Sequence, residues 1–315
     1  MARLGARRAT RLGAPLGVAL AAALLAPLPG GSTASGTVPP TARDGVIQVV
    51  AAENFWGSIA SQVGGRHVHV VAIVANPNTD PHSYEPTAAD ARAIALSQLV
   101  IENGIGYDPW VARLVAADQG GQDVLDVGGL LGVPDDGNPH RWYNPADVSV
   151  VIGRLAAEYS RLDPANKAYF ARRRAYVDTV ALRTYHSLIA SISSQYRGTP
   201  VGASESIFAM LAPALGLRLI TPYAFLRAIS EGTEVAAADK QAIDTQIRRH
   251  LIKIYVYNSQ NTTPDVLAQL MAARAARIPV ASITETLAPP TASFQAWQVR
   301  QLGGIKAALA RAAGR

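Results

Sequence analysis

The chain has 315 residues and no cysteine, which excludes disulfides, thiolate metal sites and a lipid attached to an N-terminal cysteine. Its formal net charge is +6, but the first 35 residues contain four arginines and no acidic residue. Without them the charge is +2, so nucleic acid is not an expected partner.

Residues 1–35 are predicted to be a secretory signal peptide. Positive charge comes from Arg3, Arg7, Arg8 and Arg11, an Ala/Leu-rich stretch follows at 12–28, and small residues then offer a cleavage region. The apolar stretch is shorter than the roughly 20 residues of a membrane-spanning helix. Residues 36–45, which include Pro39-Pro40, are expected to form a flexible lead-in to the mature protein.

Strand and helix patterns alternate through residues 46–162. The predicted strands are 46–51, 68–75, 99–101 and 124–127, and the predicted helices are 54–63, a helix beginning near 87, 110–117 and 144–162. Thr87 can cap its helix together with Asp90, three residues later. This alternation is typical of βαβ units and a mostly parallel sheet, which predicts an N-terminal α/β lobe at 46–162.

Residues 163–196 are predicted to form one long, rigid helix. Asp163-Pro164 is a strong start signal, an N-cap followed by proline at the first helical position. No proline or glycine follows as far as Gln195, which gives a rod of roughly 48 Å. Such a rod suits a connector between two lobes better than a crossover within one lobe.

The alternation resumes at residues 197–315, the predicted C-terminal lobe. Its expected strands are 200–203, 218–221, 254–257 and 279–283, and its expected helices are 205–215, 240–252, 264–277 and 294–313. The fold class predicted from the sequence is therefore α/β, with two βα lobes joined by one long helix.

Four residues that can bind a metal lie just beyond predicted strands: His82, His140, Glu205 and Glu285. Open α/β sheets bind ligands at this edge. Two imidazoles and two carboxylates suit a divalent transition metal, and the carboxylates cancel its charge. Each residue also has an ordinary interpretation, as a hydrogen-bonded loop histidine or as an acid near a helix start. The full set nevertheless predicts a metal site in a cleft between the lobes.

Short motifs over nearly the whole mature chain point to one family. They are Asn54-Phe55-Trp56, the run 80–90, Asn103-Gly104 before Trp110, Pro139-His140-Arg141-Trp142 with Pro145, Ser204-Glu205 before Phe208, Glu231-Gly232, and Ile278-Pro279 leading to Thr284-Glu285. With these motifs the sequence resembles the solute-binding proteins of zinc and manganese ABC importers, also called the metal-binding adhesin family.

The resemblance implies two Rossmann-like lobes bridged by a long helix. It matches His82 and His140 to the two histidine ligands of the N-terminal lobe. It matches Glu205 to a third ligand that is glutamate in manganese-type members, and Glu285 to a fourth that is usually aspartate. The chain departs from the family in lacking a lipidation cysteine and a His-rich loop, and in carrying Asn258 where many relatives have glutamate.

These observations predict a monomer that captures Zn²⁺ or Mn²⁺ in the periplasm or at the cell surface and delivers it to an ABC-type membrane permease. It is not expected to be an enzyme. A metal-dependent hydrolase is one alternative, but it requires an open coordination position and a general base, and no HExxH motif is present. A surface adhesin is another. The choice between the two metals stays open, because most such sites bind Zn²⁺ more tightly even where the ligands suit Mn²⁺.

Overall fold

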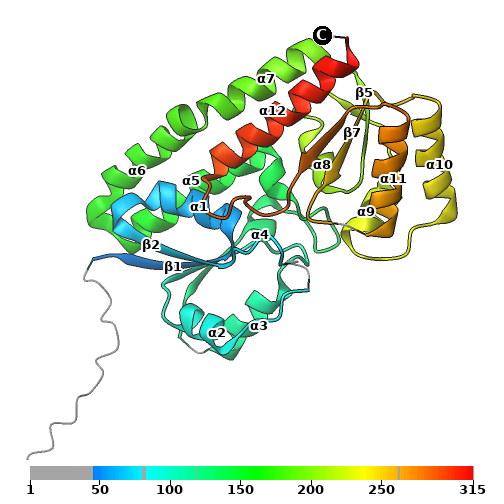
Figure 1. Ribbon diagram of the computed structural model, residues 1–315. Coiled ribbons are helices and arrows are strands. Elements are labelled where there is room, and N and C mark those ends of the chain that lie inside the picture. The colour runs from blue at the N-terminus through cyan, green and yellow to red at the C-terminus, as the bar shows by residue number, and fades with distance from the viewer. Residues whose placement is uncertain (1–44, 80–82, 119, 262, 315) are drawn as a thin grey trace, which may run out of the picture. The chain divides into compact units, whose positions relative to one another are not determined.

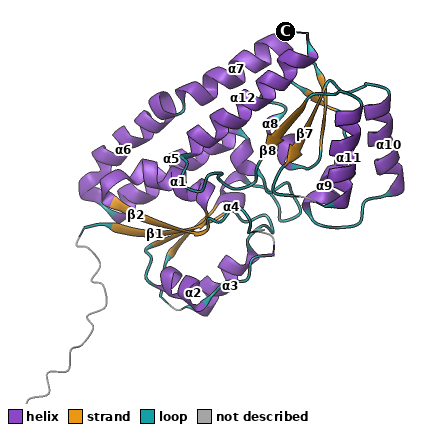
Figure 2. Cartoon of the chain, viewed as in Figure 1, coloured by secondary structure: helices purple, strands orange, loops and turns teal. Residues whose placement is uncertain are grey.

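Two four-stranded parallel sheets form the framework of the protein (Figures 1 and 2). This computed structural model describes residues 45–79, 83–118, 120–261 and 263–314. The predicted signal peptide, nearly all of the lead-in and His82 lie outside these residues. None of the helices in the described ranges combines the length and the apolar character that a membrane span requires.

The first sheet has the order β2-β1-β3-β4. Its strands are β1 (Ile47–Glu53), β2 (Val68–Val74), β3 (Leu99–Glu102) and β4 (Asp123–Asp126). The helices of this lobe are α1 (Asn54–Gly64), α2 (Ala88–Ala95), α3 (Pro109–Ala117), the short α4 (Val127–Leu131) and α5 (Pro145–Leu162). Alternate β1 residues serve different cores: Val49 packs in the cluster that contains α1 and α5, whereas Val50 packs with residues of α2 and α3.

The second sheet has the order β6-β5-β7-β8, and all its pairs are parallel. Its strands are β5 (Pro200–Ala203), β6 (Arg218–Leu219), β7 (Ile254–Asn258) and β8 (Val280–Ile283). Its helices are α8 (Ile207–Leu211), α9 (Tyr223–Ser230), α10 (Ala237–Arg248) and α11 (Pro264–Ala275). Two parallel α/β lobes are therefore confirmed. The sequence did not predict α9, and α8 begins two residues later than expected, so Glu205 lies in a turn.

The connector differs from the uninterrupted helix that the sequence predicted. After a 3₁₀ turn at Pro164–Asn166 it consists of α6 (Lys167–Tyr176), a π-helical turn at Val177–Ala181, and α7 (Arg183–Tyr196). The Leu182 N–H donates to the Val177 carbonyl at 3.0 Å, a five-residue step. Val177 and Leu182 are both buried, and the wider turn places both side chains against the core. Tertiary packing thus interrupts a sequence that contains no helix breaker.

The last helix, α12 (Phe294–Ala312), packs along α7 and also reaches α1 (Figure 1). The Phe294 N–H donates to Ser58 Oγ at 2.9 Å, and Gln295 Nε2 donates to Gln62 Oε1 at 2.8 Å. A helix that follows the second sheet is therefore bonded to the first helix of the N-terminal lobe. The domain boundaries predicted from the sequence remain predictions.

Candidate functional site

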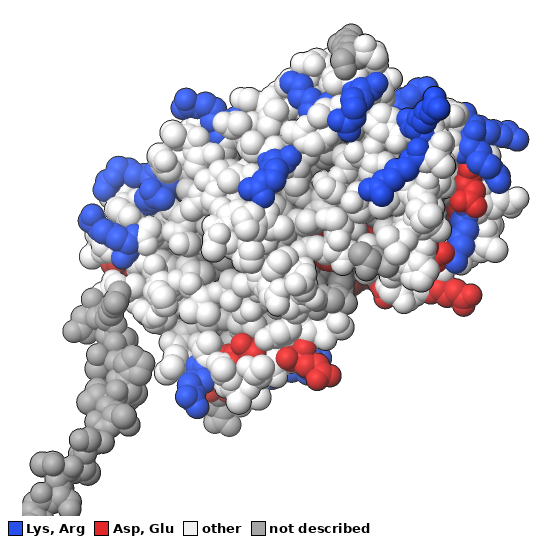
Figure 3. Space-filling view, viewed as in Figure 1, with Lys and Arg blue, Asp and Glu red and all other residues white. Residues whose placement is uncertain are grey.

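A cleft of about 560 Å³ lies where the loops after β2, β5, β7 and β8 meet. Its described lining is polar and contains three acidic residues but neither lysine nor arginine: Pro77, Asn78, Thr79, Ser83, Glu205, Ile229, Ser230, Glu231, Gly232, Asn258, Gln260, Asn261, Thr263 and Glu285. In the face shown in Figure 3, most Lys and Arg side chains lie in the upper half, and the acidic side chains lie along the right edge and in the lower half. A cleft lined by acids without basic residues favours a cation.

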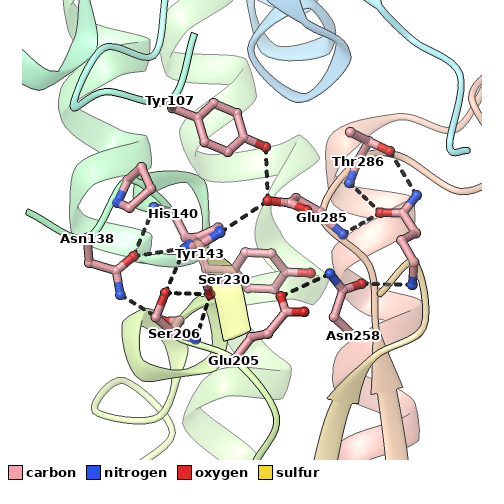
Figure 4. A network of polar contacts seen from close by, with 12 residues as sticks. Tyr107, Asn138, His140, Tyr143, Glu205, Ser206, Ser230, Asn258, Glu285 and Thr286 are labelled. Atoms are coloured by element: carbon pink, nitrogen blue, oxygen red, sulfur yellow. Dashed lines mark hydrogen bonds and ion pairs between the residues drawn. The ribbon is translucent and has the colours of Figure 1, made fainter. Parts of the chain in front are cut away.

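His140 is completely buried in the loop before α5. Its Nδ1 lies 2.9 Å from Asn138 Oδ1, which also accepts the His140 backbone N–H at 3.1 Å. Asn138 Nδ2 donates to the Ser206 carbonyl at 2.8 Å, so the orientation of this amide is determined by its partners. Because Asn138 Oδ1 can only accept, His140 Nδ1 carries a proton and Nε2 is turned toward Glu285 (Figure 4).

Glu285 lies in the loop after β8, and two residues of the N-terminal lobe contact its carboxylate. Glu285 Oε1 is 3.2 Å from His140 Nε2 and accepts from Tyr107 Oη, also at 3.2 Å. Burial raises the pKa of Tyr107 well above its ordinary value, so the phenol keeps its proton and remains a donor. The Glu285 backbone N–H donates to Gln260 Oε1 at 2.7 Å. The carboxylate is thus held by residues of the N-terminal lobe, and the backbone that carries it is held by Gln260.

Glu205 occupies the turn between β5 and α8 and is 2% exposed. Its Oε2 accepts from Asn258 Nδ2 at 3.1 Å. The next residue, Ser206, has its Oγ 3.3 Å from His140 Nδ1 and 2.9 Å from Ser230 Oγ. Glu205 and Glu285 line the same cleft. The structure thus brings His140 and Glu285 into contact and places Glu205 beside them.

His82, the fourth predicted ligand, lies outside the described residues, although Thr79 and Ser83 on either side of its segment line the cleft. Beyond it, Thr87 and Asp90 form the predicted capping box at the start of α2. Among the residues that the structure describes, no three His, Cys, Asp or Glu side chains are grouped so that they could hold a metal ion. The four-ligand set therefore stays a prediction.

Tyr107, Asn138 and Gln260 are site residues that the sequence interpretation missed. Each contacts a predicted ligand or its loop with a phenol or an amide rather than with a charged group. Gln260 follows β7 by two residues, and this position at a strand end was the available signal. Asn138 is two residues before His140, which is the usual spacing for a side chain that bonds a nearby backbone N–H.

Three acids lie near the site. Glu53 at the end of β1 and Asp108 just before α3 are buried, and Glu102 at the end of β3 is partly buried. Burial raises the pKa of Glu53 well above its ordinary value, that of Glu102 to about 7, and that of Asp108 to about 6. Asp108 accepts the N–H groups of Asn103 and Gly104 at 2.7 and 2.8 Å, which favours its ionised form. Burial and the nearby charge of Asp108 therefore favour the protonated form of Glu53.

Comparison with protein families gives one match over most of the chain. The family described as zinc-uptake complex component A, periplasmic, matches residues 49–308. A metal ABC transporter substrate-binding lipoprotein of Streptococcus cristatus is 29% identical over 43% of this chain and 48% of its own length. A manganese-binding lipoprotein of Halalkalibacterium halodurans is 25% identical over 56% of this chain and 60% of its own. The chain thus spans only about half the length of these curated relatives.

Solved structures show the same fold at low sequence identity. A manganese-bound periplasmic metal binding protein from Candidatus Liberibacter asiaticus superposes with a TM-score of 0.69, at 19% identity over 83% of this chain and 98% of the other. The nickel complex of the binding protein FpvC from P. aeruginosa gives a TM-score of 0.67, at 19% identity over 84% and 97%. At this level of identity the likeness establishes the fold alone.

Proposed function

Because the chain belongs to the family of zinc-uptake complex components A, we propose that it captures a divalent transition metal outside the cytoplasm and delivers it to an ABC-type membrane permease. In this role the metal is cargo, bound reversibly and passed on. The family consists of substrate-binding transport proteins, and we propose binding without turnover rather than the hydrolase that the sequence left as an alternative.

The observation that carries this proposal is the contact between His140 Nε2 and Glu285 Oε1 at 3.2 Å. Since Nδ1 holds a proton against Asn138, Nε2 has a lone pair when the ring is neutral. Two electron-rich atoms would then face each other in a buried place, an arrangement that a shared cation stabilises. A proton fills this role when the ring is charged, and a metal ion fills it when the ring is neutral.

The proposed ligands are His140, Glu205 and Glu285, with His82 added from the sequence. Two carboxylates balance the charge of a divalent ion, which makes its transfer into a dry site tolerable. Asn138 holds the His140 ring as a carboxylate or carbonyl usually holds a metal-bound histidine. Zn²⁺ and Mn²⁺ are the cargoes that best match this mixture of nitrogen and oxygen donors.

Location and partners follow from the proposed transport role. The named relatives are lipoproteins, but this chain has no cysteine, so we propose an exported protein that is not lipidated through cysteine. We further propose that it acts as a monomer and presents its loaded cleft to the permease. An adhesive role without metal, the other alternative from the sequence, has no supporting observation.

The test is a competitive titration of purified protein with Zn²⁺ and Mn²⁺ against a chromophoric chelator. The unaltered protein should bind at least one of them, and His140→Ala should lose most of the affinity. His186→Ala is the matched control, because His186 is exposed on α7. Equal affinities for all three proteins would remove His140 from the site, and failure of the unaltered protein to bind any divalent metal would overturn the function.

A further inference from the structure

The sheet order brings the end of β7 between the two carboxylates of the cleft. β7 lies between β5 and β8, Glu205 follows β5, and Glu285 follows β8. Asn258, the last residue of β7, is therefore placed next to both loops. We propose that Asn258 is a specificity-determining residue that favours Zn²⁺ over Mn²⁺. This inference rests on the proposed function, because it takes Glu205 as a metal ligand.

The orientation of the Asn258 side-chain amide is set by its surroundings. Its Oδ1 accepts the Gln260 N–H at 2.9 Å, and its backbone N–H donates to Ser204 Oγ at 3.1 Å. Nδ2 must then face Glu205 Oε2, which it reaches at 3.1 Å. The opposite orientation would set oxygen against the carboxylate and an N–H₂ group against the Gln260 N–H. Asn258 can therefore only donate to Glu205.

This hydrogen bond is strong because both partners are buried. Asn258 is 1% exposed and Glu205 is 2% exposed, and a bond from an amide to a carboxylate in a medium of low dielectric constant is worth more than the same bond in water. Asn258 is also neutral. Its amide bonds one oxygen of Glu205 and leaves in place the negative charge that attracts the metal. A lysine or arginine at this position would cancel that charge.

The loop that carries Asn258 is itself fixed by Gln260. Gln260 Oε1 accepts the N–H groups of Glu285 and Thr286 at 2.7 and 3.0 Å, and its Nε2 donates to the Pro77 carbonyl at 2.8 Å. The loop after β7 is thus tied to the loops after β8 and β2. The Asn258 side chain therefore extends from a loop that is held in place, and turning it away from Glu205 would also break its bond to the Gln260 N–H.

The consequence is a limit on the number of oxygens that Glu205 offers. With one lone pair of Oε2 held by Asn258, that oxygen is a poorer donor to a metal, and Glu205 acts mainly as a one-oxygen ligand through its other oxygen. Zn²⁺ is satisfied by four donors in a tetrahedral arrangement. Mn²⁺ prefers six donors, mostly oxygens. It therefore loses more binding affinity than Zn²⁺ does when a carboxylate cannot bind through both of its oxygens. The site should therefore favour Zn²⁺ over Mn²⁺ by more than the general order of divalent-metal affinities predicts.

Asn258→Ala tests this inference, with Ser259→Ala as the control from the same loop. Ser259 Oγ donates to the Ile283 carbonyl at 3.4 Å. We expect Asn258→Ala to weaken Zn²⁺ binding about tenfold, the usual effect of losing a partner of a metal ligand, and to weaken Mn²⁺ binding much less. The ratio of the two affinities should then fall by nearly the same factor. The control should retain the original ratio.

Visible absorption of the Co²⁺-loaded protein gives a second readout that does not depend on affinity. The unaltered protein should show the intense bands of four-coordinate Co²⁺, and Asn258→Ala should show weaker ones. Asn258→Ser, which is too short to reach Glu205, should repeat both results if the alanine variant does not fold. Equal losses of affinity for both metals would leave the ratio of the Zn²⁺ and Mn²⁺ affinities unchanged. That result would overturn this inference and leave the proposed function standing. A protein that binds neither metal would overturn both.

Discussion

Removing Asn138 should weaken metal binding by a predictable amount. The Asn138→Ala change deletes the acceptor 2.9 Å from His140 Nδ1 and the donor to the Ser206 carbonyl at 2.8 Å. Loss of a residue that orients a metal-bound histidine typically costs about 10- to 100-fold in affinity. That range corresponds to about 1.4–2.7 kcal/mol.

The structure indicates which end of this range applies. Ser206 Oγ is 3.3 Å from the same Nδ1 and can accept a hydrogen bond from its N–H when Asn138 is absent. Asn138→Ala alone should therefore lower the metal affinity only about tenfold. The double variant Asn138→Ala/Ser206→Ala leaves Nδ1 without either acceptor and should approach a hundredfold loss. Ser206→Ala alone should change the affinity little, because Asn138 remains in place.

The assay is a competitive titration against a chromophoric chelator near neutral pH, with thermal unfolding of the metal-free proteins to check the fold. Asn166→Ala is a suitable control, since Asn166 bonds Asp163 at the start of the connector. If the double variant bound metal as tightly as the unaltered protein, the protonated Nδ1 would be the wrong assignment. His140 Nε2 would then not be a ligand.

Four further results are expected. Metal affinity should fall as the pH drops below neutrality, because protons compete for the imidazoles; a flat titration profile would contradict histidine ligation. The pKa of Glu53 in the folded protein lies well above its ordinary value. The stability that Glu53 contributes is therefore present when the pH is below the ordinary pKa, and it is lost as the pH rises through the folded pKa. Glu53→Gln replaces the carboxyl with a neutral side chain of similar size that cannot ionise, so urea unfolding should show a smaller loss of stability with rising pH than in the unaltered protein or in exposed Glu234→Gln. Saturating metal at 100 times the dissociation constant should add about 2.7 kcal/mol to the free energy of unfolding. Small-angle scattering should show a nearly constant radius of gyration, and a change of several ångströms would contradict the stiff connector.

Local patterns in the sequence were enough to predict most of the elements and the edge of the sheet where the candidate site lies. The Thr87–Asp90 capping box needed only neighbouring residues, and the strands were marked by β-branched apolar runs. Since carboxyl ends of parallel strands share an edge, Glu205 and Glu285 could be placed on one cleft before any contact was known. His140 was placed there by its loop and by its motif.

The partners of these ligands could not be predicted in the same way. Tyr107 and Glu285 are 178 residues apart, and His140 and Glu285 are 145 apart, so no local rule relates them. The π-helical turn in the connector was also hidden, because the burial of Val177 and Leu182 causes it rather than a proline or glycine. The short α9 lay in a stretch that received no assignment, yet its Ser230 lines the cleft.

The bonds between α1 and α12 have a consequence for how the chain folds. They join residues 236 and 233 positions apart, so one face of the first helix gets its partner only when the end of the chain arrives. Closing so long a loop is entropically costly, and contacts of this kind are made slowly. A chain that is exported with its N-terminus first would therefore keep this face of α1 uncovered until α12 has followed. Late completion of the N-terminal lobe would help the chain to stay extended during translocation.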